Sequence, residues 1–130
     1  MSTYIDTSAF LAVLDEDDQN HHEAGQVWTD MINNKESLVT SNYVIVETTA
    51  LLRKRFGIPA VRRFQMDVMS VVVIEWVDEI THNAGISALL TTGRHGPSLV
   101  DCIGFEIVRK LGIERVFAYD KHFRGQGFGL

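Results

Sequence analysis

The sequence predicts an α/β protein with a mainly parallel central sheet and helices on both of its faces. Short apolar segments of strand length alternate along the chain with longer segments whose apolar residues recur every three or four positions. Strands separated by helices imply right-handed crossovers and therefore parallel pairing. The chain has 130 residues, two prolines and neither a repeat nor a linker-like stretch. We therefore expect one domain over residues 1–130.

Four strands are expected in this sheet, at residues 4–5, 38–40, 71–77 and 116–119. The first is a short apolar segment that ends at Asp6, and the last ends in the same way at Asp120. The third is rich in β-branched residues, which is typical of a buried strand. Two of the four strands therefore lead directly into a carboxylate.

The first two helices are delimited by polar residues. Thr7 or Ser8 can cap the first helix, which runs to Leu14. After a polar turn, the second helix carries apolar residues at helical spacing over residues 24–32, and Asn33-Asn34 stops it.

The next two helices are separated by a glycine. Ser41 or Asn42 can cap the third helix, which ends at Gly57. Pro59 lies near the start of the fourth, where its missing N–H is harmless, and the apolar pattern continues to Met69.

The last two helices lie in the C-terminal half of the chain. The fifth is expected over residues 78–92, with Ile80 and Leu90 facing the core. The sixth runs over residues 98–111 and is closed by Gly112.

Composition limits the class of protein. The net charge of −5, from 12 Lys+Arg against 17 Asp+Glu, argues against a generic nucleic-acid coat, although an RNA enzyme can keep a local basic rim. The single cysteine, Cys102, cannot form an internal disulfide. The N-terminus does not resemble a secretory signal, and the apolar runs are too short to span a bilayer. We expect a cytoplasmic protein with no membrane segment.

Three carboxylates stand out by position, and each also has a structural interpretation. Asp6 and Asp120 end strands, where parallel sheets usually bind ligands, but either could be a turn or cap residue. Glu47 is the only charged residue between Tyr43 and Leu52. A carboxylate on an apolar helix face is costly unless it is paired, hydrogen-bonded or bound to a metal. A partner arginine, or a place at the rim of the apolar face, explains Glu47 equally well.

A fourth carboxylate, Asp101, lies three residues after Ser98. This spacing fits a helix capping box, which is a strong structural interpretation. The two interpretations are compatible, because a helix N-terminus tolerates a carboxylate and Ser98 could orient it as a metal ligand. Four carboxylates meeting at one place would repel strongly without a cation. Oxygen ligands without a Cys/His cluster suit a hard ion, Mg²⁺ or Mn²⁺.

Taken together, these segments resemble the PIN-domain family and, within it, the VapC-type toxins of toxin–antitoxin pairs. The resemblance rests on Tyr4 to Ser8, on Glu47, on Ser98 to Cys102 and on Ala118 to Phe123, and it covers essentially the whole chain. It implies a sheet with helices on both sides, an acidic pocket at its carboxyl edge, and Mg²⁺- or Mn²⁺-dependent hydrolysis of RNA. It also implies a homodimer and a cognate antitoxin that blocks the site.

The resemblance also implies roles for particular residues. By position, catalytic and metal-binding roles fall on Asp6, Glu47, Asp101 and Asp120, and supporting roles fall on Thr7, Ser8 and Ser98. The expected mechanism is metal-assisted hydrolysis, with Asp6 and Asp120 as direct ligands and Asp101 and Glu47 binding directly or through water. The candidates for contact with RNA phosphates are Arg94, His95, Lys121 and His122.

Two other classes of function stay open. A non-catalytic interaction module could keep the fold, although all four acids are present. A phosphoryl-transfer domain, either a receiver or a haloacid-dehalogenase-like phosphatase, would also have an acidic pocket after its first strand. The phosphatase would carry an Asp two residues after Asp6, where this chain has Ser8. A housekeeping RNA-processing enzyme of the same fold remains an alternative to a toxin.

Overall fold

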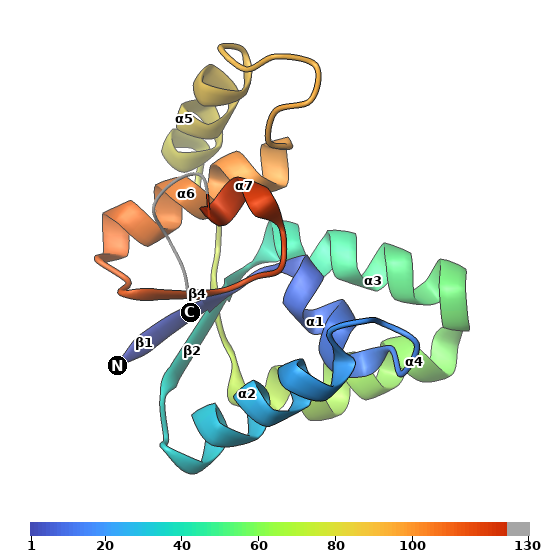
Figure 1. The fold of residues 1–130 in the computed structure, drawn as a ribbon. Helices are drawn as coiled ribbons and strands as arrows, with labels where there is room; N and C mark the ends of the chain where they lie inside the picture. Colours follow the sequence, from blue (N-terminus) through green and yellow to red (C-terminus); the bar gives the residue numbers. More distant parts are fainter. Residues whose placement is uncertain (125–130) are drawn as a thin grey trace.

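A computed structural model of the chain describes residues 1–124 (Figure 1). The glycine-rich tail over residues 125–130, which the family resemblance includes, lies outside the described residues. The described part of the chain contains one four-stranded sheet with the order β3-β2-β1-β4, and every pairing is parallel. Its strands are β1 (Ser2–Ile5), β2 (Ser37–Ser41), β3 (Val73–Glu75) and β4 (Arg115–Phe117). The predicted parallel α/β fold is confirmed.

The strand order creates a crevice at one edge of the sheet. The chain passes from β1 outward to β2 and β3, and then returns to place β4 on the other side of β1. Such a reversal leaves a crevice outside the carboxyl ends of the two strands that flank it, β1 and β4, where open α/β sheets bind ligands. Ile5 pairs with Phe117 at these ends, and the N–H of Asp6 donates to the carbonyl of Phe117 at 3.1 Å. Asp6 is therefore still held by the sheet.

Helices cover both faces of the sheet. The crossovers from β1 to β3 contain α1 (Thr7–Leu14), α2 (His21–Asn33), α3 (Asn42–Phe56) and α4 (Ile58–Arg63). The return to β4 contains α5 (Glu79–Leu89) and α6 (Leu99–Leu111), and α7 (Lys121–Arg124) follows β4. Figure 1 shows α5, α6 and α7 on one side of the sheet and α1, α2 and α4 on the other. Within residues 1–124, no helix is both long and apolar enough to cross a bilayer.

The predicted ends of α3 and the predicted ends of α6 agree with the structure, whereas the predicted cap of α1 does not. Ser41 caps α3 by accepting from the N–H of Val44, and Gly57 and Gly112 end α3 and α6 with positive φ angles of 85° and 63°. The cap of α1 was predicted at Thr7 or Ser8, and this was wrong. Asp6 is the cap, and its carboxylate accepts from the N–H of Ser8.

The predicted buried strand at residues 71–77 was wrong in its bounds and in its burial. The strand covers only Val73–Glu75, and the side chain of Val73 is 60% exposed. Because β3 lies at the edge of the described sheet, it has a neighbouring strand on one side only, and none of its three residues is buried. The last strand, predicted over residues 116–119, is also shorter in the structure. It ends at Phe117, so Asp120 lies in the loop before α7.

Two predicted helices differ in detail. The fourth helix does not continue to residue 69 as α-helix, because a π-helical turn (Phe64–Val68) and a 3₁₀ turn (Met69–Val71) follow α4. The fifth helix, predicted over residues 78–92, covers only Glu79–Leu89, and Ile80 and Leu90 are exposed and not inward as predicted. The helix instead approaches α6 through Gly85, where an added Cβ would lie 2.5 Å from Cδ1 of Ile103. This small residue sets the buried face of α5.

Candidate metal centre

A pocket of about 320 Å³ lies at the carboxyl ends of β1 and β4. All four predicted carboxylates and the three predicted supporting residues line this pocket. The full lining is Asp6, Thr7, Ser8, Leu11, Glu47, Gly96, Ser98, Asp101, Asp120 and His122. The residues come from α1 and the cap before it, from α3, from α6 and the segment before it, and from α7 and the loop before it, so the fold gathers groups that are far apart in the sequence.

Asp6 is buried at the bottom of this arrangement, with 3% of its surface exposed. Its Oδ2 accepts from the hydroxyl of Ser8 at 2.7 Å and from the N–H of Ser8 at 3.2 Å. Burial raises the pKa of Asp6 to about 7, and the nearby carboxylates of Asp101 and Asp120 raise it too, against the lowering effect of Ser8. This carboxyl group is therefore ionised at neutral pH only at a cost, which a cation would remove.

Asp101 is held in place by the capping box that the sequence predicts. The N–H of Ser98 donates to Oδ2 of Asp101 at 3.1 Å, and the N–H of Asp101 donates to Oγ of Ser98 at 3.2 Å. Burial and the carboxylate of Asp120 raise the pKa of Asp101, while the hydrogen bonds from Ser98 lower it. The structural and functional interpretations of Asp101 therefore coexist in one side chain.

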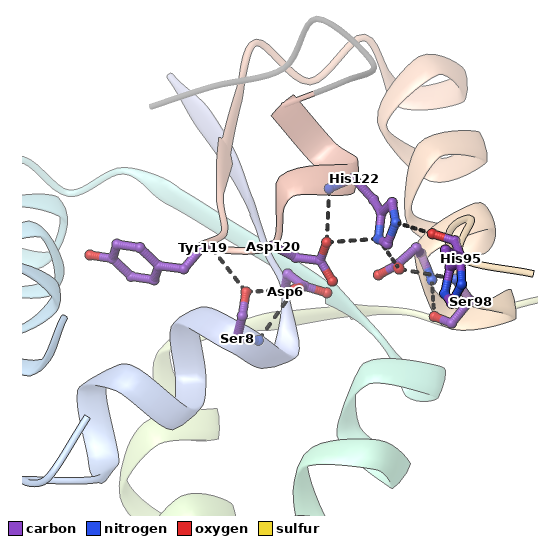
Figure 2. Close-up of polar contacts among 8 residues, drawn as sticks. Asp6, Ser8, His95, Ser98, Tyr119, Asp120 and His122 are labelled. Carbon is purple, nitrogen blue, oxygen red and sulfur yellow. Dashed lines mark hydrogen bonds and ion pairs between the residues drawn. The ribbon is translucent and has the colours of Figure 1, made fainter. Parts of the chain in front are cut away.

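Asp120 lies in the loop that leads into α7, beside His122, which belongs to that helix (Figure 2). Its Oδ1 accepts from the backbone N–H of His122 at 2.8 Å and lies 2.9 Å from Nδ1 of the same residue. Nδ1 of His122 also lies 3.6 Å from Oδ2 of Asp101, and Nε2 lies 3.1 Å from the carbonyl oxygen of His95. The ring of His122 therefore lies between the acidic pocket and the loop before α6.

Glu47 contributes a carboxylate from α3, and it is half-buried. The described part of the chain offers it neither a hydrogen bond nor a cation within salt-bridge distance, so the partner-arginine interpretation is wrong. The hydroxyl of Thr48 donates to that of Thr7 at 3.3 Å and ties α3 to α1 next to the pocket. The negative charge of Glu47 and of the other pocket carboxylates also acts on Tyr4. Burial is the main cause that raises the pKa of Tyr4, and the carboxylates of Asp6, Asp101 and Glu47 raise it further.

The predicted phosphate contacts divide into two groups. The side chains of Arg94, His95 and Lys121 are exposed and are not part of the pocket lining. His122 lines the pocket, and both of its ring nitrogens face protein atoms. The sequence predicted His122 only as a candidate for contact with RNA phosphate and did not indicate its contact with the carboxylates of Asp101 and Asp120.

The residues of this pocket fit a divalent cation. Among the described residues 1–124, its lining is rich in carboxylate oxygens and contains neither lysine nor arginine to balance them. One donor atom from each of Asp101, Asp120 and His122 lies within 4.8 Å of the others. Nδ1 of His122 is buried and makes no hydrogen bond of good geometry within residues 1–124. Like charges gathered in this way, beside a nitrogen without a hydrogen bond, are typical of a site that a metal completes.

The fold and the pocket together define an α/β protein with an acidic crevice, whose residues fit a divalent cation, at the switch point of its parallel sheet. The chain belongs to the PIN-domain family, since the model of the PIN domain matches residues 3–128.

Two comparisons with known proteins agree with this assignment. The chain is 30% identical over 126 residues to the 23S rRNA-specific endonuclease VapC20 of Mycobacterium tuberculosis, covering 96% of this chain and 94% of that protein. Its structure is similar to the crystal structure of the same toxin, described as cleaving the sarcin-ricin loop. The TM-score is 0.85 at 29% identity, over 97% of this chain and 95% of that one. These matches favour the PIN-domain prediction over the receiver and phosphatase alternatives.

Proposed function

We propose that this protein is a metal-dependent endoribonuclease that hydrolyses RNA phosphodiester bonds and acts as the toxin of a toxin–antitoxin pair. The observation that carries the proposal is the convergence of four carboxylates, from Asp6, Glu47, Asp101 and Asp120, on one pocket. The similarity to VapC20, whose names describe a toxin and an rRNA endonuclease, supports it and makes 23S rRNA the first substrate to test.

In this proposal the carboxylates of Asp6, Asp101 and Asp120 hold a Mg²⁺ or Mn²⁺ ion, with Glu47 binding directly or through water. When bound, such an ion lowers the pKa of water and stabilises the charge that develops on the phosphate. Ser8 and Ser98 orient the carboxylates of Asp6 and Asp101 through the hydrogen bonds described above.

Glu47 is the carboxylate best suited to take the proton from the attacking water. Asp6, Asp101 and Asp120 each accept hydrogen bonds from neighbouring protein groups. The oxygens of Glu47 have no such donor in the described part of the chain and face the same pocket. A carboxylate that is free to accept a proton, beside ligands that are already hydrogen-bonded, fits the role of general base.

RNA is recognised in this proposal by the exposed rim of the pocket. Arg94 and His95 lie in the loop before α6, and Lys121 lies at the start of α7. The main-chain carbonyl of His95 reaches His122 in the pocket, so this loop is adjacent to the acidic centre. Cationic side chains at this rim can bind RNA phosphates while the net charge of the whole chain stays negative.

The proposed partners are a cognate antitoxin, which blocks the pocket, and a second copy of the chain. A homodimer is supported by the segment from Val73 to Ile80, which exposes the side chains of Val73, Trp76 and Ile80 at the β3 edge of the sheet. We place the protein in the cytoplasm, where its RNA substrate and antitoxin are made and where the free Cys102 stays reduced.

A cleavage assay tests the proposal. Purified protein, free of any copurified inhibitor, is incubated with 23S rRNA and with an unrelated structured RNA in Mg²⁺, Mn²⁺ or EDTA. The key variant is Asp101→Asn, because an amide oxygen can still accept the capping hydrogen bond from Ser98. Asp30→Asn, at an exposed carboxylate on α2, is the matched control.

Cleavage that requires a divalent ion, persists in Asp30→Asn and is lost in Asp101→Asn is the expected result. A folded wild-type protein that binds Mn²⁺ but cuts neither RNA would refute these substrates. A folded protein that binds no metal and cuts no RNA would support the non-catalytic interaction module instead.

A further inference from the structure

We propose that His122 is itself a ligand of the metal centre and adds an imidazole nitrogen, Nδ1, to the carboxylates of Asp101 and Asp120. The inference rests on the proposed function, because it concerns the same metal. The sequence predicted that His122 contacts RNA phosphate. The present proposal assigns His122 to the metal instead.

The first step is the orientation of the ring. Nε2 of His122 lies 3.1 Å from the carbonyl oxygen of His95, which can only accept a hydrogen bond. Nε2 therefore carries a hydrogen, and in the neutral ring Nδ1 then presents a lone pair to the pocket. Histidines that bind metals usually donate their other ring N–H to a backbone carbonyl or carboxylate in this way, which fixes the tautomer and the ring orientation.

The second step is what Nδ1 faces. It lies 2.9 Å from Oδ1 of Asp120 and 3.6 Å from Oδ2 of Asp101, and it makes no hydrogen bond of good geometry. A lone pair directed at two carboxylates is repelled unless a positive charge lies between them. The three donor atoms lie within 4.8 Å of one another, and bonds of about 2.1 Å to one ion place donors about 3–4 Å apart. A modest adjustment would bring all three onto one cation.

The third step is that the backbone holds the ring in this position. The N–H of His122 donates to Oδ1 of Asp120 at 2.8 Å. The next residue, Phe123, is buried against Tyr4 and Phe105, with ring centroids 6.2 and 4.8 Å away. Helix α6 makes room for it with Gly104, where an added Cβ would lie 2.8 Å from the ring of Phe123. The imidazole is therefore positioned before any metal binds.

An imidazole ligand has a consequence for metal choice. Mg²⁺ strongly prefers oxygen donors, whereas Mn²⁺ also accepts nitrogen and binds mixed sites more tightly. We therefore expect this site to prefer Mn²⁺ over Mg²⁺, and we expect that preference to depend on His122.

Pulsed electron paramagnetic resonance of the bound Mn²⁺ tests the assignment without reference to catalysis. Directly bound imidazole couples its ¹⁴N nucleus to the electron spin of Mn²⁺. The wild-type chain is compared with His122→Ala and with His122→Asn, which keeps a polar side chain. His22→Ala, at an exposed histidine on α2, is the matched control. Affinities for Mn²⁺ and Mg²⁺ are measured in parallel by calorimetry.

We expect ¹⁴N coupling in the wild type and in His22→Ala, and its loss in both His122 variants. Mn²⁺ affinity should fall about tenfold or more in those variants, while Mg²⁺ affinity changes less. Mn²⁺ bound without ¹⁴N coupling in the wild type would overturn the assignment while leaving the carboxylate site intact, and this holds even if the variants fail to fold. Coupling that survives in a folded His122 variant would also overturn it. Failure of the wild type to bind Mn²⁺ at all would instead refute the metal centre of the proposed function.

Discussion

The hydroxyl of Ser8 donates a hydrogen bond of 2.7 Å to Oδ2 of Asp6 (Figure 2). Oγ of Ser8 in turn accepts a hydrogen bond of 2.9 Å from the backbone N–H of Tyr119. Ser8 thus joins the first turn of α1 to the loop that carries Asp120. One side chain therefore orients the most buried carboxylate and also fixes the loop that supplies another.

Replacing Ser8 by alanine should slow RNA cleavage more than it destabilises the protein. We expect Ser8→Ala to cleave about 10–100-fold more slowly, because Asp6 loses the group that orients it. The free energy of unfolding should fall by about 2 kcal/mol, as for the two hydrogen bonds that the hydroxyl makes with Asp6 and Tyr119. Single-turnover cleavage in saturating Mn²⁺ and urea unfolding measure the two effects. Ser70→Ala, which removes an exposed hydroxyl bonded to the carbonyl of Asp67, should leave cleavage unchanged. Cleavage by Ser8→Ala at the wild-type rate would contradict this role.

The stability of the metal-free protein should fall as the pH rises toward neutrality. Burial raises the pKa of Asp6 from 3.8 to about 7 in the folded state, so folding takes up a proton between these values. The contribution of Asp6 to stability is therefore fully present below pH 3.8 and is lost as the pH rises through about 7. Melting temperatures in EDTA between pH 5 and pH 8 measure this loss.

Asp6→Asn isolates the effect of this carboxyl group, because an amide does not ionise. The variant should lose less stability than the wild type over the same pH range, and saturating Mn²⁺ should stabilise it less. Asp67→Asn, at an exposed carboxylate, should follow the wild type. Parallel curves for the wild type and Asp6→Asn would show that the carboxyl group of Asp6 does not titrate in this range.

Glu47→Gln should separate catalysis from stability. The carboxylate of Glu47 has no hydrogen bond or ion pair within residues 1–124, so its loss should change the free energy of unfolding by less than about 1 kcal/mol. If it is the general base, cleavage should fall by about 100-fold or more. Glu106→Gln, at a half-buried carboxylate outside the pocket, should keep its activity. An active Glu47→Gln variant would assign the proton transfer to another group.

Local patterns predicted the parts of this site that depend on neighbours in the sequence. The capping box of Ser98 and Asp101 is a contact across three residues, and its spacing was visible in the chain. The meeting of Asp6 with Asp120 follows from parallel strands, because their carboxyl ends share one edge of the sheet. Glu47 was found through the cost of a carboxylate on an apolar helix face.

Features that depend on tertiary packing were not predictable in this way. The exposure of Val73 follows from the edge position of β3, which β-branched content does not reveal. The buried face of α5 is set by the approach of Gly85 to Ile103 and not by the largest apolar residues of the helix. The orientation of His122 depends on a carbonyl 27 residues away in the chain.

The exposed apolar segment at the β3 edge should be the dimer interface. Val73, Trp76 and Ile80 are 60%, 69% and 81% exposed, and a monomer would leave this apolar surface in water. Trp76→Glu should weaken dimerisation by about thirtyfold or more, because losing an interface aromatic typically costs about 2 kcal/mol and a charge would take its place. Sedimentation equilibrium over a range of concentrations measures the dissociation constant.

Leu90→Glu is the matched control for this experiment, because Leu90 is 79% exposed beyond the other end of α5. It should leave the dimer intact. Each copy of the chain supplies all four carboxylates of its own pocket, so monomeric Trp76→Glu should retain cleavage activity per chain. A Trp76→Glu dimer as strong as the wild type would place the interface elsewhere, and a monomer without activity would mean that the pocket needs the second copy.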